Sequence, residues 1–416
     1  MPFASLKTLR TDTKWFRALL FGSIYFIEGA ILTYFSGFNA LYLRSFDLSY
    51  TRIGVAGGIA LLPFVLKIFI GMWSDKVNLL GLGHRKPLMI LGILMQGVGL
   101  VLAPLVNPAT AFPWFIAVLL LISLGMSTYD TCSDGLAIDT TPPAERGFVQ
   151  GVMVAARALA AIVLAATIGL LVSRVSWTAA FLFIAVITFL PLVLVLQVRE
   201  AERPAGKEFT LSGFRSFLTR KMGLFLLLGM VYPLVLYSVN GVLGAFLNEV
   251  VGINMVQVGL YTSLFGVGAV LGGVSGGPFA DRLGRRTSML LALVVTSVSL
   301  LALVGSASAG LAIGAVVIFG IAFGYYETVY MAAGMDFADP RIAATMFAII
   351  MAVGNIGIGA GQPLAGILVD SMGFRGLFIV LCLVNLATLP LVPLIFSRGR
   401  GTEYQKGRGQ SETPVA

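Results

Sequence analysis

Long apolar runs are the feature that most constrains how this chain can fold. They are continuous rather than alternating, and mostly short polar segments separate them. A helix needs about 20 apolar residues to cross the hydrocarbon core of a bilayer, with its backbone polar groups bonded inside the segment. The chain has only 11% charged residues, whereas soluble domains have about 25%. The sequence therefore predicts an all-α membrane protein and excludes an ordinary soluble enzyme.

The runs predict twelve transmembrane helices in two bundles of six. They are expected at residues 16–43, 53–73, 87–106, 113–138, 148–173, 177–197, 222–248, 257–279, 288–305, 309–334, 343–369 and 374–396. The longest polar segment, 198–221, is expected to be a cytoplasmic linker between an N-terminal six-helix bundle, 1–197, and a C-terminal one, 222–396. The Gly-rich polar tail, 397–416, is expected to be disordered and cytoplasmic.

The distribution of basic residues predicts the orientation in the membrane. Of the 28 Lys and Arg residues, 21 fall in segments on the side of the N-terminus, and four fall in the opposite loops. Cytoplasmic loops carry the excess of Lys and Arg in membrane proteins. Both termini are therefore expected to face the cytoplasm of a bacterial inner membrane. The same pattern accounts for the net charge of +9 without nucleic acid as a partner.

The sequence offers little for bound metals, cofactors or covalent catalysis. Cys132 and Cys382 lie in apolar runs, and the single histidine, His84, lies in a loop. These residues cannot supply a metal-ligand set or a nucleophile–histidine pair. The sequence also has no phosphate-binding P-loop for ATP. We expect neither an enzyme nor a cofactor, and we expect a monomer.

The two halves of the chain repeat each other. The loop after the eighth span reads GPFADRLGRR at 277–286, and a related loop with an insertion follows the second span. In the fourth and tenth spans, Asp130 and Asp139 correspond to Glu327 and Asp336 at an offset of 197 residues. Internal repeats are typical of transporters that rock one bundle against the other.

The loop at 277–286 fits the G-x-x-[AS]-D-R-x-G-R-R signature, and the chain resembles the major facilitator superfamily. A second superfamily pattern, at the junction of the fourth and fifth spans, is matched by Pro142, Arg146, Gly147 and Gly151. Within the superfamily, residues 38–151, including YDTCSDGLAIDTTPPAERG, are most similar to the muropeptide permease and peptide–acetyl-CoA transporter family. The resemblance implies the two-bundle fold and import of a solute together with a proton.

The resemblance also implies a role for the two repeated loops. In the superfamily, such loops latch the halves together on the cytoplasmic side in the outward-facing state. The residues that match are Asp75, Arg85, Gly277, Asp281, Arg282, Gly284, Arg285 and Arg286. The alternative is that the basic residues only set the membrane topology.

Ionisable residues inside the spans are candidates for function. Such a charge is costly in a membrane, so it pairs, faces a cavity or takes up a proton. The acids Glu28, Asp130, Asp134 and Glu327 are the candidates for proton coupling. Asp130 and Asp134 share one helix face, and Arg157 is their expected partner. The alternatives are a structural charge cluster, or an ion pair of Glu28 with Lys67 or Arg157.

Other polar and aromatic residues are candidates for solute binding. They are Lys67, Arg157, Tyr34, Asn39, Tyr326, Tyr330, Asn240 and Asn355. Cations can bind an anionic group, and tyrosines can stack on or hydrogen-bond a solute. The alternatives are that Lys67 extends to the membrane surface, that the tyrosines form an interfacial belt, and that the amides only join helices.

Two hypotheses about function follow. The first is a secondary active transporter that moves a muropeptide-like or other anionic organic solute by alternating access with proton symport. The second is a pigment or lipid delivery factor on the same fold, because the loop after the second span also resembles the bacteriochlorophyll-delivery branch. The buried acids are essential under the first hypothesis and dispensable under the second.

Overall fold

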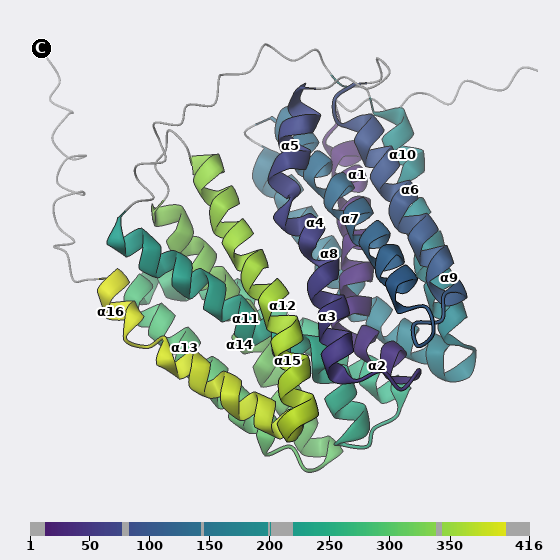
Figure 1. The fold of residues 1–416 in the computed structure, drawn as a ribbon. Helices are drawn as coiled ribbons and strands as arrows, with labels where there is room; N and C mark the ends of the chain where they lie inside the picture. The colour runs from purple at the N-terminus through teal and green to yellow at the C-terminus, as the bar shows by residue number, and fades with distance from the viewer. Residues whose placement is uncertain are drawn as a thin grey trace, which may run out of the picture.

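The computed structural model describes residues 13–76, 83–142, 145–198, 200, 219–337 and 343–396. The regular structure of these residues is helical (Figure 1). Eleven stretches among them are long and apolar enough to cross a membrane. The last, Ile349–Ile395, has 47 residues and turns at Gly373, whose φ is +75°. At 1.5 Å per residue it is long enough to cross twice, so twelve crossings account for the helices.

The described residues of the N half, up to residue 198, form ten α-helices. They are α1 (Lys14–Gly37), α2 (Asn39–Arg44), α3 (Tyr50–Ala60), α4 (Leu62–Val65), α5 (Lys67–Lys76), α6 (Lys86–Leu102), α7 (Phe112–Thr140), α8 (Arg146–Arg174), α9 (Trp177–Phe189) and α10 (Leu192–Gln197). A short 3-10 turn, Ala103–Leu105, follows α6.

The C half contains the remaining helices. They are α11 (Arg220–Glu249), α12 (Met255–Leu283), α13 (Arg285–Val304), α14 (Ala309–Phe337), α15 (Ala343–Ala387) and α16 (Leu391–Ile395). The predicted division of the chain at 198–221 stays a prediction. Residues 199 and 201–218 of that linker and the predicted tail at 397–416 lie outside the described residues.

Prolines divide three of the predicted spans, which the sequence analysis treated as single helices. Pro63 stands in the first turn of α4, Pro191 caps α10 and Pro390 caps α16. Proline has no N–H group and its ring clashes with the preceding turn, so it is tolerated best where a helix begins. The chain therefore restarts a helix at each of these positions, still within the same crossing.

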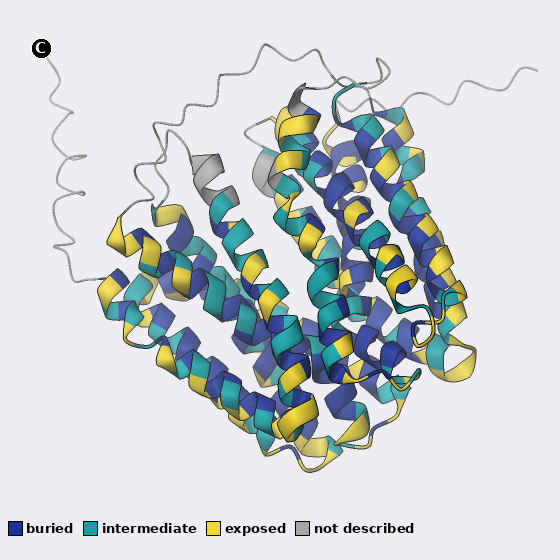
Figure 2. Ribbon diagram, in the orientation of Figure 1, coloured by how far each residue is buried: buried dark blue, intermediate teal, exposed yellow. Residues whose placement is uncertain are grey.

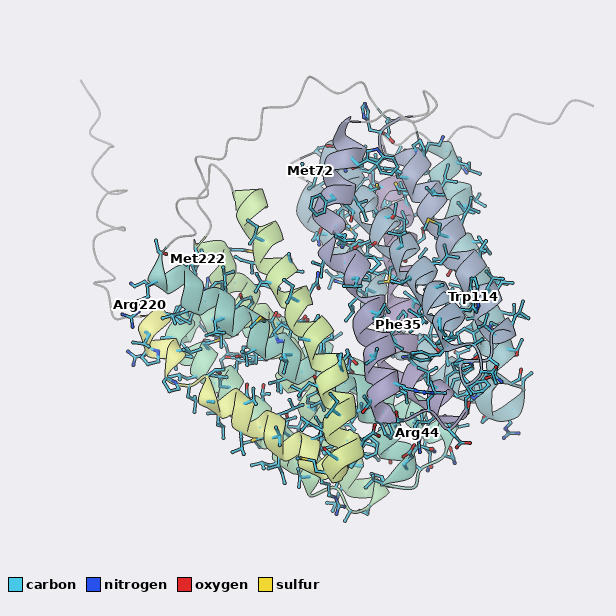
Figure 3. The ribbon with its side chains drawn as sticks, in the orientation of Figure 1. Phe35, Arg44, Met72, Trp114, Arg220 and Met222 are labelled. Atoms are coloured by element: carbon cyan, nitrogen blue, oxygen red, sulfur yellow. The ribbon has the colours of Figure 1, made fainter. Side chains whose placement is uncertain are left out.

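Both halves meet at one end of the molecule and separate at the other (Figure 1). We call the end at which α1, α6 and α11 begin the terminal end, and the opposite end the far end. Buried residues fill the interior of each half and the region where the halves meet (Figure 2). At the terminal end, Met72 of α5 and Met222 of α11 lie well apart (Figure 3).

Glycines allow the halves to meet closely. A methyl group added at Gly54 of α3 would lie 2.2 Å from the carbonyl oxygen of Gln362 on α15. One at Gly244 of α11 would lie 2.1 Å from the carbonyl oxygen of Gly37 on α1. One at Gly259 of α12 would lie 2.5 Å from a carbonyl oxygen of α8. Three helix pairs between the halves thus touch backbone to backbone, as small residues permit.

Polar contacts also join the halves at the far end. The Asp370 carboxylate of α15 accepts hydrogen bonds from the backbone N–H groups of Tyr50 (2.9 Å) and Thr51 (2.7 Å) and from the Thr51 hydroxyl (2.7 Å). It thereby caps the first turn of α3 from the other half. Arg44 pairs with Glu249 at 3.0 Å, and both side chains are about one-third exposed.

These two contacts are expected to differ in strength. Glu249→Gln removes an exposed ion pair, which contributes about 0–1 kcal/mol. Asp370→Ala removes a helix cap, which contributes about 0.5–2 kcal/mol. Spin labels on the exposed Ser45 and Met372 report opening of the far end. Asp370→Ala should increase the open population more than Glu249→Gln does, and the reverse order would contradict this account.

Candidate functional site

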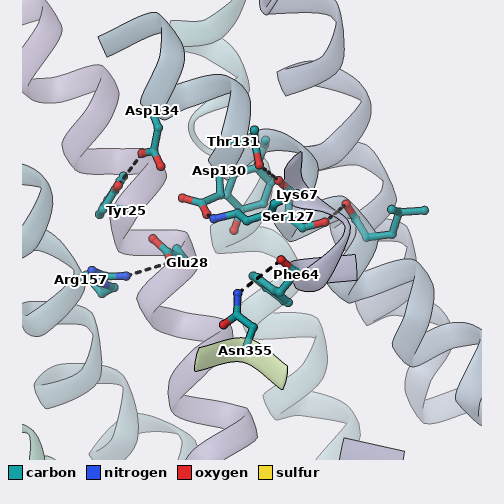
Figure 4. A network of polar contacts seen from close by, with 12 residues as sticks. Tyr25, Glu28, Phe64, Lys67, Ser127, Asp130, Thr131, Asp134, Arg157 and Asn355 are labelled. Atoms are coloured by element: carbon teal, nitrogen blue, oxygen red, sulfur yellow. Dashed lines mark hydrogen bonds and ion pairs between the residues drawn. The ribbon is translucent and has the colours of Figure 1, made fainter. Parts of the chain in front are cut away.

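The charged site lies in the N half, on the side that faces the C half (Figure 4). Lys67, at the start of α5, forms an ion pair with Asp130 of α7. Arg157 of α8 donates to Glu28 of α1 at 3.0 Å. The Asp130 and Glu28 side chains are only 5% and 6% exposed, whereas Lys67 is 29% and Arg157 is 42% exposed. The acids are therefore almost fully covered by protein, whereas part of the surface of each cation stays accessible.

Asp134 has a different kind of partner. Its carboxylate accepts a hydrogen bond of 2.6 Å from the hydroxyl of Tyr25 on α1. The guanidinium of Arg157 lies over the Tyr25 ring, 5.3 Å from its centroid. Asp134 is also within electrostatic range of Asp130 and Lys67. All the N-half candidates for proton coupling and both cations therefore form one network.

The C half holds a similar pair. Glu327 of α14 accepts a hydrogen bond of 2.7 Å from the hydroxyl of Tyr237 on α11. In each half, a tyrosine of the first crossing thus bonds an acid of the fourth crossing. The acids are not equivalent in the repeat, because the offset of 197 residues matches Glu327 to Asp130 and not to Asp134. Glu327 is also within electrostatic range of Arg157 across the space between the halves. The network therefore extends from one half to the other.

The balance of charge in this network suits proton exchange. It has four carboxyls but two cations, and each cation has a direct carboxylate partner. Asp134 and Glu327 instead accept hydrogen bonds from phenols. A carboxylate that lacks a cation in a low-dielectric site can become neutral by binding a proton. These two acids are the groups that can do so without breaking an ion pair.

The expected pairing of Arg157 with Asp130 or Asp134 was wrong. The helix α8 packs along α1, which brings Arg157 to Glu28. The helix α5 packs on α7, which brings Lys67 to Asp130. Lys67 thus binds an acid inside the N half and does not extend to the membrane surface. The sequence left open an ion pair of Glu28 with Lys67 or Arg157, and the structure has the pair with Arg157.

Four residues predicted to bind solute lie instead in the cores of the halves. Tyr34 is 1% exposed, donates to Asn39 at 3.2 Å and packs on Phe181. Tyr326 is 0% and Tyr330 is 1% exposed, and both pack against Tyr232. The Asn39 side chain is buried with Tyr34. These side chains are covered by their own half and pack there, and their role in solute contact stays a prediction.

Of the two remaining amide candidates, Asn355 lies at the contact between the halves. Asn355 of α15 donates to the Phe64 carbonyl of α4 at 3.3 Å and so joins the halves beside Lys67 (Figure 4). The break in the helix between α4 and α5, at Leu66, leaves this stretch of backbone irregular. Asn240 is 9% exposed on α11.

Two basic residues of the repeated loops bind acids within their own half. Arg85 donates from Nε to Asp139 at 3.0 Å, and Arg285 donates from Nε to Asp336 at 2.6 Å. Arg285 also donates to Asp281 at 2.9 Å. Asp139 and Asp336 are the residues that the repeat matched, so the two halves share this contact. The latch between the halves stays a prediction for the state in which the terminal end closes.

Other loop candidates have the following places. Gly284 has a φ of +79°, which turns the chain between α12 and α13 and favours glycine. Arg282 is exposed, Arg286 and Gly277 are half-buried, and Pro142 and Gly151 are exposed. Asp75, Arg146 and Gly147 lie outside the residues whose side-chain surroundings the structure describes.

The sequence analysis missed several contact residues. Tyr25 and Tyr237 are the phenol partners described above. Each lies three residues, about one helical turn, before a candidate residue, Glu28 or Asn240, and this spacing was the available signal. Glu200 accepts hydrogen bonds from the backbone N–H groups of His84 (2.8 Å) and Arg85 (2.9 Å), and so caps α6. Within the described part of the chain, no group of three His, Cys, Asp or Glu residues could hold a metal ion.

Comparison with known proteins agrees with this architecture. Among solved structures, the nucleoside transporter NupG matches with a TM-score of 0.74 and 13% identity over 93% of this chain and 99% of that one. A bacterial homologue of the human lysosomal transporter Spinster, inward-facing and occupied, matches with a TM-score of 0.67 and 17% identity over 92% and 93%. These likenesses support the fold alone.

Several relatives in sequence are named as transporters. The folate-biopterin transporter of Synechocystis sp. is 25% identical, with 99% of this chain and 87% of the relative covered. AmpG 4 of Rickettsia conorii, described as a transporter, is 22% identical over 80% and 85%. The sialic acid transporter NanX of Escherichia coli is 25% identical over 63% and 64%. The family model of the Major Facilitator Superfamily matches residues 21–254 and 225–415. The chain therefore belongs to the Major Facilitator Superfamily and is a multi-pass membrane transporter of a solute.

Proposed function

We propose that the protein is a proton symporter for an anionic organic solute of the bacterial inner membrane, with both termini in the cytoplasm. The observation that carries the proposal is the network at the space between the halves. It combines two partly exposed cations, Lys67 and Arg157, with two acids, Asp134 and Glu327, that bond only phenols among the contacts described above.

The cations suit an anionic solute. Arg157 has a planar guanidinium that can hold a carboxylate or phosphate through two hydrogen bonds, and Lys67 adds a compact positive charge. A solute anion that approaches Arg157 competes with Glu28, and one that approaches Lys67 competes with Asp130. Release of either acid from its ion pair then favours uptake of a proton by the network. Solute and proton binding would thus be coupled electrostatically.

The arrangement of the halves supports alternating access. With the termini in the cytoplasm, the described conformation is inward-facing, because the halves meet at the far end (Figure 1). Rocking to the opposite state must break the far-end contacts of Asp370 and Glu249 and close the terminal end. The repeated loops at 277–286 and around Arg85 lie at that end and are proposed to latch it.

The test is solute uptake into proteoliposomes with and without an inside-alkaline pH gradient. The panel contains muropeptides, short peptides, acyl-CoA and sugars. We expect accumulation that depends on the gradient, and we expect Asp134→Asn and Glu327→Gln to abolish accumulation but keep solute exchange at equal pH. Asp47→Asn is the matched control, because Asp47 is an exposed acid with a φ of +59° that asparagine also adopts.

Two outcomes would contradict the proposal. Accumulation that is unchanged in both variants would show that these acids do not couple protons. Absence of any uptake, together with a pigment or lipid that co-purifies, would favour the delivery-factor alternative.

A further inference from the structure

A cavity of about 500 Å³ lies within the N half. Its walls come from α1, α7 and α8 and from the residue that follows α7. The lining residues are Tyr25, Asp134, Ala137, Ile138, Thr141, Val149, Gln150 and Met153. The hydrogen-bonded pair of Tyr25 and Asp134 is therefore part of the wall, together with a hydroxyl and an amide.

The cavity extends from the charged network toward the terminal end. Ala137 and Thr141 lie three and seven residues after Asp134, and Thr141 directly follows α7. This spacing puts the three residues on one face of the helix. Asp130 lies one turn before Asp134 on this face. On α8, Gln150 lies two turns from Arg157, nearer the start of the helix, and faces the same way. The cavity thus borders the charged network at Asp134, and its lining residues continue along α7 and α8 toward the terminal end of the molecule.

Asp134 is the one proton-coupling candidate among the lining residues of this cavity. Glu28 and Asp130 hold cations, and Glu327 lies in the C half. The charged and titratable groups around Asp134 are Tyr25, Glu28, Asp130, Lys67 and Arg157. A cavity of this size can hold ordered water where polar groups line it, and here a carboxyl, a phenol, a hydroxyl and an amide do so beside apolar side chains. Asp134 therefore borders this cavity, whereas the two paired acids do not line it.

We propose that this cavity is filled with water and that Asp134 releases its proton through it to the terminal end. The inference rests on the proton symport proposed above and adds the releasing group and its route. In the step, the O–H bond of the protonated Asp134 carboxyl breaks and the proton passes to a water molecule. The resulting hydronium leaves past Thr141 and Gln150, and the carboxylate keeps the hydrogen bond from Tyr25.

Cysteine accessibility tests whether the cavity holds water. In a background of Cys132→Ala and Cys382→Ala, the variants Ala137→Cys and Leu136→Cys are compared in nanodiscs. The two residues are neighbours on α7 and are 8% and 1% exposed, but only Ala137 lines the cavity. The reagent is an anionic, water-soluble methanethiosulfonate, which requires an ionised thiol and hence water. We expect Ala137→Cys to react at least tenfold faster than Leu136→Cys.

A plug variant tests whether this water carries the proton. Val149→Phe places a larger side chain in the cavity, and Val163→Phe makes the same change at an exposed position of α8. We expect Val149→Phe to slow the labelling of Ala137→Cys at least tenfold and to abolish gradient-driven accumulation. Solute exchange at equal pH should continue, because exchange requires no proton release. Val163→Phe should leave labelling and transport unchanged.

The outcomes separate this inference from the proposed function. Equal labelling of Ala137→Cys and Leu136→Cys overturns the inference without any transport measurement. A second contrary result is that Val149→Phe blocks the labelling of Ala137→Cys yet keeps coupling, while Asp134→Asn loses coupling. That result also overturns the inference, but it leaves proton symport in place. Loss of solute exchange in Val149→Phe alone would assign the cavity to the solute instead. Unchanged coupling in Asp134→Asn and Glu327→Gln means that the proposed function has failed.

Discussion

Gly54→Ala is expected to hold the far end open, whereas Gly57→Ala is not. The added methyl group at Gly54 would lie 2.2 Å from the Gln362 carbonyl oxygen, and only backbone movement can relieve that contact. At Gly57 the nearest atom is the flexible end of the Gln362 side chain, at 3.4 Å. Overpacking costs about 1–3 kcal/mol, which corresponds to a change of roughly 5- to 150-fold in the ratio of closed to open states.

The two variants are matched because both lie on α3, and each replaces glycine with alanine. Both gain the same helix propensity and the same loss of unfolded-state freedom. Their difference therefore reports the contact with α15. The measurement is the distance distribution between spin labels at Ser45 and Met372, in the absence of solute. Identical distributions in both variants would mean that the halves do not rock about the contact of α3 with α15.

The fold class could be predicted from the sequence because the apolar runs leave little choice. A lipid-facing backbone must bond internally, so each run becomes a helix. The breaks at Pro63, Pro191 and Pro390 were missed because proline inside a membrane helix is often tolerated without one. Where the chain restarts depends on the packing around each proline, and one sequence does not show that packing.

The buried charges were predictable as a set, but their pairing was not. Glu28, Asp130, Lys67 and Arg157 stand out because ionisable residues are rare in such spans. Which pairs form depends on which helices lie side by side, and neighbours in this fold are often distant in the chain. The tyrosines show a second limit of the sequence. Tyrosines near the acid of the tenth span suggested solute contact, but a large amphipathic ring serves equally well in a core.

Lys67→Met is expected to destabilise the protein more than Asp130→Asn does. Breaking a buried ion pair costs about 3–5 kcal/mol, because the partner is left as an uncompensated charge. Asp130 is 5% exposed, so its carboxylate cannot reach water when Lys67 is lost. Lys67 is 29% exposed, so its ammonium can turn to water when Asp130 is lost. Thermal unfolding in detergent should therefore show the larger loss for Lys67→Met.

The double variant Lys67→Met/Asp130→Leu distinguishes a structural role of the ion pair from a role in solute transport. Replacement of a buried ion pair by apolar side chains of similar size is often neutral or stabilising by about 1–4 kcal/mol. We expect the double variant to unfold at or above the temperature of the unmodified protein and to have lost solute exchange. A double variant that is as unstable as Lys67→Met would instead give the pair a structural role. Recovered stability without transport would mean that these charges serve the solute, because an apolar pair would hold α5 against α7 equally well.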